Sequence, residues 1–133
     1  MNRLHGTLTA IQQSDSLRRV VVEVEGTPLT LVSLELPDAF REGAAATVVF
    51  KESEVILATG NTEGISIANR IPAIVKELVM GEVLAEVALE APVGTIISLI
   101  TAASAQRLGL APGKPVTALI KANELSLTEP EDG

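Results

Sequence analysis

Three short stretches of the chain contain the side chains best suited to recognising a ligand. They are Ser66–Arg70 (SIANR), Ser98–Ser104 (SLITAAS) and Ile120–Glu124 (IKANE). Together they supply hydroxyl groups, small residues that leave the backbone accessible, asparagines and one lysine. Such donors suit a tetrahedral oxyanion with two charges, because hydroxyls, backbone N–H groups and a helix N-terminus give directed hydrogen bonds without a dense positive field. The alternative is that these residues only form turns and helix caps.

Enzymatic chemistry has little support in the residue types. The chain has no cysteine, its single histidine is His5, and no G-x-S-x-G, P-loop or HExxH motif is present. Five glutamates alternate with apolar residues along predicted strands, which indicates a solvated face rather than paired catalytic carboxylates or a Ca²⁺ loop. They are Glu23, Glu25, Glu82, Glu86 and Glu90. We therefore expect no catalytic residue, no cofactor and no bound metal cation.

Composition restricts the partners. The net charge is −7 and the ten basic residues are scattered, which argues against nucleic acid. No apolar signal core follows the N-terminus and no apolar run approaches about 18 residues, so we expect a soluble cytoplasmic protein without a membrane partner. Hydrophobic residues make up 47% but aromatic residues only 2%, which predicts thin aliphatic cores and therefore a homo-oligomer.

An internal repeat must position these residues. GKPVTALIKANELSL, residues 113–127, matches GAAATVVFKESEVIL, residues 43–57, seventy positions earlier. The first copy predicts five strands with a turn at Gly26–Pro28. The strands are residues 3–11, 17–25, 29–36, 44–50 and 53–58.

The second copy repeats this order and carries five additional residues between Leu99 and Gly113. These predict a helical turn that begins at the N-cap Thr101 and ends before Gly109. The polar linker Thr59–Gly64 separates the copies. The predicted fold is all-β with this short helical turn: two tandem OB-like five-stranded barrels, residues 1–60 and 64–133.

The second copy, Ile65–Leu127, resembles the Mop domain of molybdate-binding proteins. It contains versions of the S-A-R-N start, the I-T-x-x-S-x-x-x-L-G-L turn and the V-x-A-x-I-K-A-x-E-V close. The first copy, Asn2–Ala58, resembles a divergent Mop repeat, so the whole chain is similar to the tandem-repeat (di-Mop) molbindins. The resemblance implies a trimer that holds molybdate, or tungstate in related forms, between subunits.

The resemblance, together with the donor types, assigns a ligand-binding set in the second repeat, with the SIAN stretch and the other two stretches contributed by different subunits. The set is Ser66, Ile67, Ala68, Asn69, Thr101, Ser104, Lys121 and Ala122. Ala68 stands where the family pattern has arginine, so this position can offer only a backbone N–H.

A first-repeat site would use Asn2, Arg3, Lys51 and Ser53. Met1 directly precedes Asn2, which leaves no room for the leading serine, and Glu52 places a carboxylate beside Lys51. We therefore expect the second repeat to carry the better site and the first-repeat sites to be altered or absent, with sites between a first and a second copy as the open alternative.

The leading functional hypothesis is intracellular storage or homeostasis of molybdate. The alternative is a regulatory, oxyanion-sensing or interaction module, since similar repeats occur attached to DNA-binding domains and transporter ATPase subunits. Neither a helix-turn-helix nor a P-loop accompanies the repeats here, which favours the first hypothesis.

Overall fold

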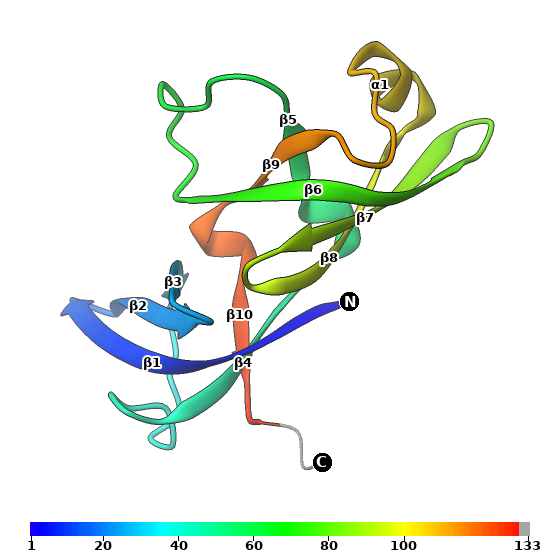
Figure 1. Ribbon diagram of the computed structural model, residues 1–133. Coiled ribbons are helices and arrows are strands. Elements are labelled where there is room, and N and C mark those ends of the chain that lie inside the picture. The colour runs from blue at the N-terminus through cyan, green and yellow to red at the C-terminus, as the bar shows by residue number, and fades with distance from the viewer. Residues whose placement is uncertain (131–133) are drawn as a thin grey trace.

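The computed structural model describes residues 1–130 and contains two five-stranded antiparallel sheets, one above the other (Figure 1). The first repeat supplies β1 (Asn2–Ser14), β2 (Leu17–Val24), β3 (Thr27–Ser33), β4 (Ala45–Phe50), the 3₁₀ turn η1 (Glu52–Glu54) and β5 (Ile56–Ala58). The second supplies β6 (Asn69–Met80), β7 (Leu84–Ala91), β8 (Gly94–Thr101), the helix α1 (Ala102–Arg107), β9 (Pro115–Ile120), the 3₁₀ turn η2 (Ala122–Glu124) and β10 (Ser126–Thr128). The predicted fold class, mostly β in two five-stranded units, is confirmed.

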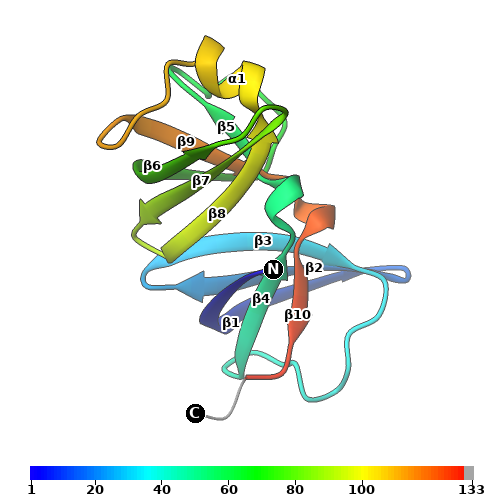
Figure 2. The same ribbon diagram turned by 90° about the vertical axis from the view of Figure 1, so that its right-hand side faces the viewer.

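The two repeats exchange their last strands. The sheet orders are β10-β4-β1-β2-β3 and β5-β9-β6-β7-β8, so β5 joins the sheet of the second repeat and β10 that of the first. Figure 2 shows β10 running down from the upper unit to lie beside β4. Each predicted barrel therefore takes its fifth strand from the other repeat. The division into residues 1–60 and 64–133 remains a prediction, and residues 131–133 lie outside the described residues.

The repeat is regular through the first three strands of each copy. Leu8 on β1 pairs with Val22 on β2, and Val75 on β6 pairs with Leu89 on β7, 67 positions later in each case. A register shift follows Leu8 and Val75 alike. Further on, the positive-φ glycines Gly43 and Gly113 are 70 positions apart, so the second copy carries three additional residues between these points rather than the predicted five.

The turn between β2 and β3 lies one residue earlier than predicted. Glu25 and Gly26 have φ of 48° and 81°, as a type I′ hairpin turn requires. Pro28 accordingly lies inside β3, paired with Glu23. An edge strand tolerates proline because one side of its backbone needs no ladder hydrogen bond.

The helix α1 forms where the sequence predicts it. The Thr101 hydroxyl caps it by accepting a hydrogen bond from the Ser104 N–H at 3.1 Å, and Gly109, with φ of 62°, follows its last turn. The Lys114 ammonium donates hydrogen bonds to the carbonyls of Leu108 and Gly109 at that end. No helix in residues 1–130 is long and apolar enough to cross a membrane.

The core is aliphatic, as composition predicts. Alternate residues of the strands are buried and join one cluster that runs through both sheets, with Phe40 and Phe50 its only aromatic members. Two buried asparagines, Asn2 and Asn69, and the buried Ser98 hydroxyl, which donates to the Val55 carbonyl at 2.8 Å, tie the repeats together by hydrogen bonds. The sheets therefore share apolar and polar contacts as well as strands.

Candidate functional site

Two of the three predicted stretches meet in one pocket. Its volume is about 440 Å³, and it is formed by the loop before β6, the connection from β9 to η2, and one residue of β3. We call it the Lys121 pocket; its lining residues are Val32, Ser66, Ile67, Ala68, Lys121, Ala122 and Asn123. Both stretches come from the same chain, whereas the sequence analysis expected different subunits to contribute them.

Strand pairing explains why these stretches meet. β6 and β9 are antiparallel, and their ladder ends at the pair Asn69 and Ile120. The residues just beyond this pair, Ala68 and Lys121, therefore leave the sheet side by side and form the pocket walls.

The pocket contains donors that this chain does not use internally. Among residues 1–130, neither the Ser66 hydroxyl nor the Lys121 ammonium has a hydrogen-bond or carboxylate partner, and both residues are exposed. Lys121 is the single charged residue of the lining. The arrangement can offer one cation and one hydroxyl to an anion without first breaking an internal ion pair.

Asn69 adjoins the pocket, but its side chain does not face it. That side chain is 3% exposed and bonds the backbone of Thr30 on β3 and of Ile120 on β9. A ligand could therefore meet only the backbone of Asn69.

Thr101 and Ser104 do not line the Lys121 pocket of the same chain. They bond each other at the start of α1, hydroxyl to hydroxyl at 2.9 Å, and Arg107 reaches the Ser104 hydroxyl at 3.5 Å. For Thr101 and Ser104 to contact an anion in this pocket, as predicted, they would have to come from a different subunit.

The first-repeat candidates are arranged differently. Asn2 is buried and bonds Ile97 on β8, while Arg3, Lys51 and Ser53 are exposed. The Lys51 backbone N–H donates to the Glu54 carboxylate at 2.9 Å. The pocket beside Lys51, of about 250 Å³, is not lined by Asn2, Arg3 or Ser53.

Glu52 brings a carboxylate to the first-repeat position. It lies 70 positions before Ala122, in the same place at the start of its 3₁₀ turn, and it pairs with the amino group of Met1. The hydrogen bond from that amino group lowers the pKa of the Glu52 carboxyl. The exposed carboxylate therefore stays charged at a place where the second repeat has only a methyl group.

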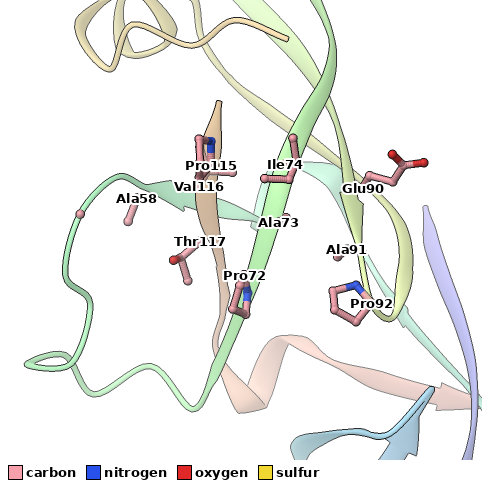
Figure 3. A pocket seen from close by; sticks show the side chains of 11 residues that line it. Ala58, Pro72, Ala73, Ile74, Glu90, Ala91, Pro92, Pro115, Val116 and Thr117 are labelled. Carbon is pink, nitrogen blue, oxygen red and sulfur yellow. The ribbon is translucent and has the colours of Figure 1, made fainter. Parts of the chain in front are cut away.

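A larger pocket of about 600 Å³ lies on the second sheet, and the sequence analysis did not predict it (Figure 3). Prolines and aliphatic residues of β6, β9 and the β7–β8 turn line it, among them Pro72, Ile74, Pro92 and Pro115. Its single charged lining residue is Glu90, so it does not suit an anion. The signal available in the sequence was three prolines, which lie near the start of β6, in the β7–β8 turn and at the start of β9.

Among the described residues we find no group of side chains arranged for a reaction that uses His5 or for binding a metal cation. His5 is exposed on β1, and its Nδ1 lies 3.0 Å from the hydroxyl of its buried cross-strand partner Thr47. Within residues 1–130 no group of three or more His, Cys, Asp or Glu side chains could hold a metal ion.

Comparison with known proteins assigns the fold to a family. A TOBE domain matches residues 65–127. The chain is 36% identical over 123 residues to the molybdenum-pterin-binding protein MopA of Rhodobacter capsulatus, covering 91% of this chain and 43% of MopA. It is 34% identical over 90 residues to the molybdenum import ATP-binding protein ModC of Rhizobium etli, covering 66% of this chain and 25% of ModC. It thus spans less than half the length of these curated relatives.

A solved structure agrees over nearly the whole chain. The cytoplasmic molybdate-binding protein ModG, with molybdate bound, superposes with a TM-score of 0.88 at 31% identity, covering 97% of this chain and 96% of that one. The match includes both repeats, and the family predicted from the sequence motifs is confirmed. The chain belongs to the Mop-domain family, in its form with two tandem repeats.

Proposed function

We propose that this protein binds molybdate, and that the Lys121 pocket forms part of the binding site. One observation carries the proposal: Lys121 and Ser66 lie in one pocket, and within residues 1–130 the Lys121 ammonium has no carboxylate partner and the Ser66 hydroxyl has no hydrogen-bond partner. ModG and MopA are named for binding molybdate and molybdenum-pterin, which supports the choice of anion. The oxyanion is a ligand here and not the cofactor of an enzyme.

We further propose that a second subunit completes the site in a homo-oligomer, with a trimer as the specific expectation. The Lys121 pocket supplies only one side chain with a charge, while Thr101 and Ser104 lie elsewhere on the same chain. Exposed apolar side chains, including Ile74 and Val83, support association. A monomer in sedimentation equilibrium at micromolar concentration would contradict this part.

The role we propose is storage or homeostasis of molybdate in the cytoplasm. The cytoplasmic description of ModG supports this location. The similarity to ModC, an ATP-binding protein of molybdenum import, favours the alternative of a regulatory sensing module. Tungstate would use the same donors, since it is also a tetrahedral dianion.

Titration calorimetry with molybdate, tungstate and sulfate on the wild type and on Lys121→Ala tests the proposal. We expect molybdate to bind the wild type more tightly than sulfate, and Lys121→Ala to weaken it. A wild type that binds no molybdate, or a Lys121→Ala variant with wild-type affinity, would refute the assigned site.

A further inference from the structure

Asn69 connects three walls of the Lys121 pocket. In the chain it directly follows Ala68, which belongs to the first wall. Its Nδ2 donates a hydrogen bond of 3.1 Å to the carbonyl of Ile120, and Ile120 directly precedes Lys121 in the second wall. It also holds Thr30, two residues before Val32 in the third wall. Residues two apart on a strand share a face, so fixing Thr30 fixes the place of Val32.

The bonds to Thr30 define one orientation of the amide. The Thr30 N–H donates to Oδ1 at 2.8 Å, and Nδ2 donates to the Thr30 carbonyl at 2.8 Å. Because Thr30 offers one donor and one acceptor, a flipped amide would lose both bonds. The side chain is 3% exposed and therefore shielded from competing water.

We propose that Asn69 is a positioning residue for the oxyanion site: it sets the spacing between Ala68, Lys121 and Val32 without touching the anion through its side chain. The inference rests on the proposed function and deepens it, since it makes an edge strand of the first repeat part of a site that belongs to the second. A group held by buried neighbours keeps a fixed geometry, and a fixed geometry raises both affinity and selectivity.

Thr47 provides a control for the loss of a buried polar group. It is fully buried on β4, and its hydroxyl lies 3.0 Å from Nδ1 of His5. Thr47, His5 and the residues next to them in the chain do not line the Lys121 pocket. Loss of the Thr47 hydroxyl should therefore lower stability without disturbing that pocket.

The test measures molybdate and sulfate affinity by calorimetry for the wild type, Asn69→Ala and Thr47→Val, at a temperature where circular dichroism shows all three folded. We expect both variants to melt at lower temperature. Asn69→Ala should weaken molybdate binding about tenfold and reduce its preference over sulfate, as loss of a supporting residue does around bound metals. Thr47→Val should keep both values near the wild type. Asn69→Ser replaces Asn69→Ala if the alanine variant does not fold.

The outcomes separate the two claims. Equal affinity losses in the two variants, or an unchanged Asn69 variant, would overturn the positioning role while the wild type still binds molybdate. A wild type without molybdate binding would overturn the proposed function, and the positioning role with it.

Discussion

The side-chain amide of Asn2 bonds both the N–H and the carbonyl of Ile97, each at 2.8 Å, although 95 positions separate the two residues. β8 is the outer strand of its sheet, so this amide takes the place of a neighbouring strand at that point. Asn69 does the same for Thr30 on β3, the outer strand of the other sheet. The repeats are thus joined by two equivalent contacts, one at each edge.

Asn2→Ala should destabilise the protein, because it leaves the half-buried backbone groups of Ile97 without their partner. The expected loss is about 1–3 kcal/mol in the free energy of unfolding, the range for a buried group left unsatisfied. Urea unfolding measures it. Gln12→Ala, on an exposed part of the same strand, is the control and should change stability by less than about 0.5 kcal/mol. Equal losses would argue against the assigned role of Asn2.

Lys121→Ala should weaken molybdate binding more than Lys51→Ala does. Lys121 has no carboxylate partner in residues 1–130, whereas Glu52 stands beside Lys51 and opposes an anion there. Loss of a charged hydrogen bond costs about 1.5–3 kcal/mol, or roughly ten- to a hundredfold in affinity. Calorimetry compares the two. Abolished binding in Lys51→Ala with normal binding in Lys121→Ala would move the site to the first repeat.

Ala122→Glu should make the second repeat resemble the first at this position. The new carboxylate would stand beside Lys121 in the pocket and repel a dianion, so we expect molybdate affinity to fall by at least about tenfold, and less so at high salt. Ala122→Gln has a similar size without the charge. If both variants bind alike, bulk rather than charge explains the effect.

The pH dependence of stability should include a contribution from Glu52. The hydrogen bond from the Met1 amino group lowers the pKa of this carboxyl in the folded state, so the charged form favours folding. This contribution is present above the ordinary pKa of a glutamate and is lost as the pH falls through the lowered folded value. Urea unfolding of wild type and Glu52→Gln should differ near neutral pH and converge in strong acid. A constant difference at all pH values would rule out this linkage.

Much of the fold could be predicted from local sequence signals. Alternation of apolar residues identified the strands, and the caps Thr101 and Gly109 identified α1 because helix ends have specific chemical requirements. The exchange of β5 and β10 could not be predicted, since both repeats have the same strand pattern and either partner would satisfy it.

The site residues remain a prediction, although the fold brings some of them together. Residue type and the family motif singled out Ser66 and Lys121, which the fold brings together. The buried contacts of Asn69 could not be read from the sequence, because its partner Thr30 lies in the other repeat and backbone groups leave no signal in residue type. The joining of Ser66–Ala68 to Lys121 within one chain also depends on strand register, which a linear pattern specifies only weakly.

The exchanged strands predict that residues 1–60 cannot complete a sheet by themselves. Their sheet contains β10, which pairs through Ser126, Leu127 and Thr128 with β4, while β5 of the same segment belongs to the other sheet. A peptide of residues 1–60 would expose the β4 edge and the apolar face of β5, so we expect it to lack a cooperative thermal transition and to aggregate. Adding the peptide of residues 61–133 should restore the transition, because it supplies β10 and accepts β5. A sharp transition of residues 1–60 alone would show that the exchange is dispensable for folding of the first repeat.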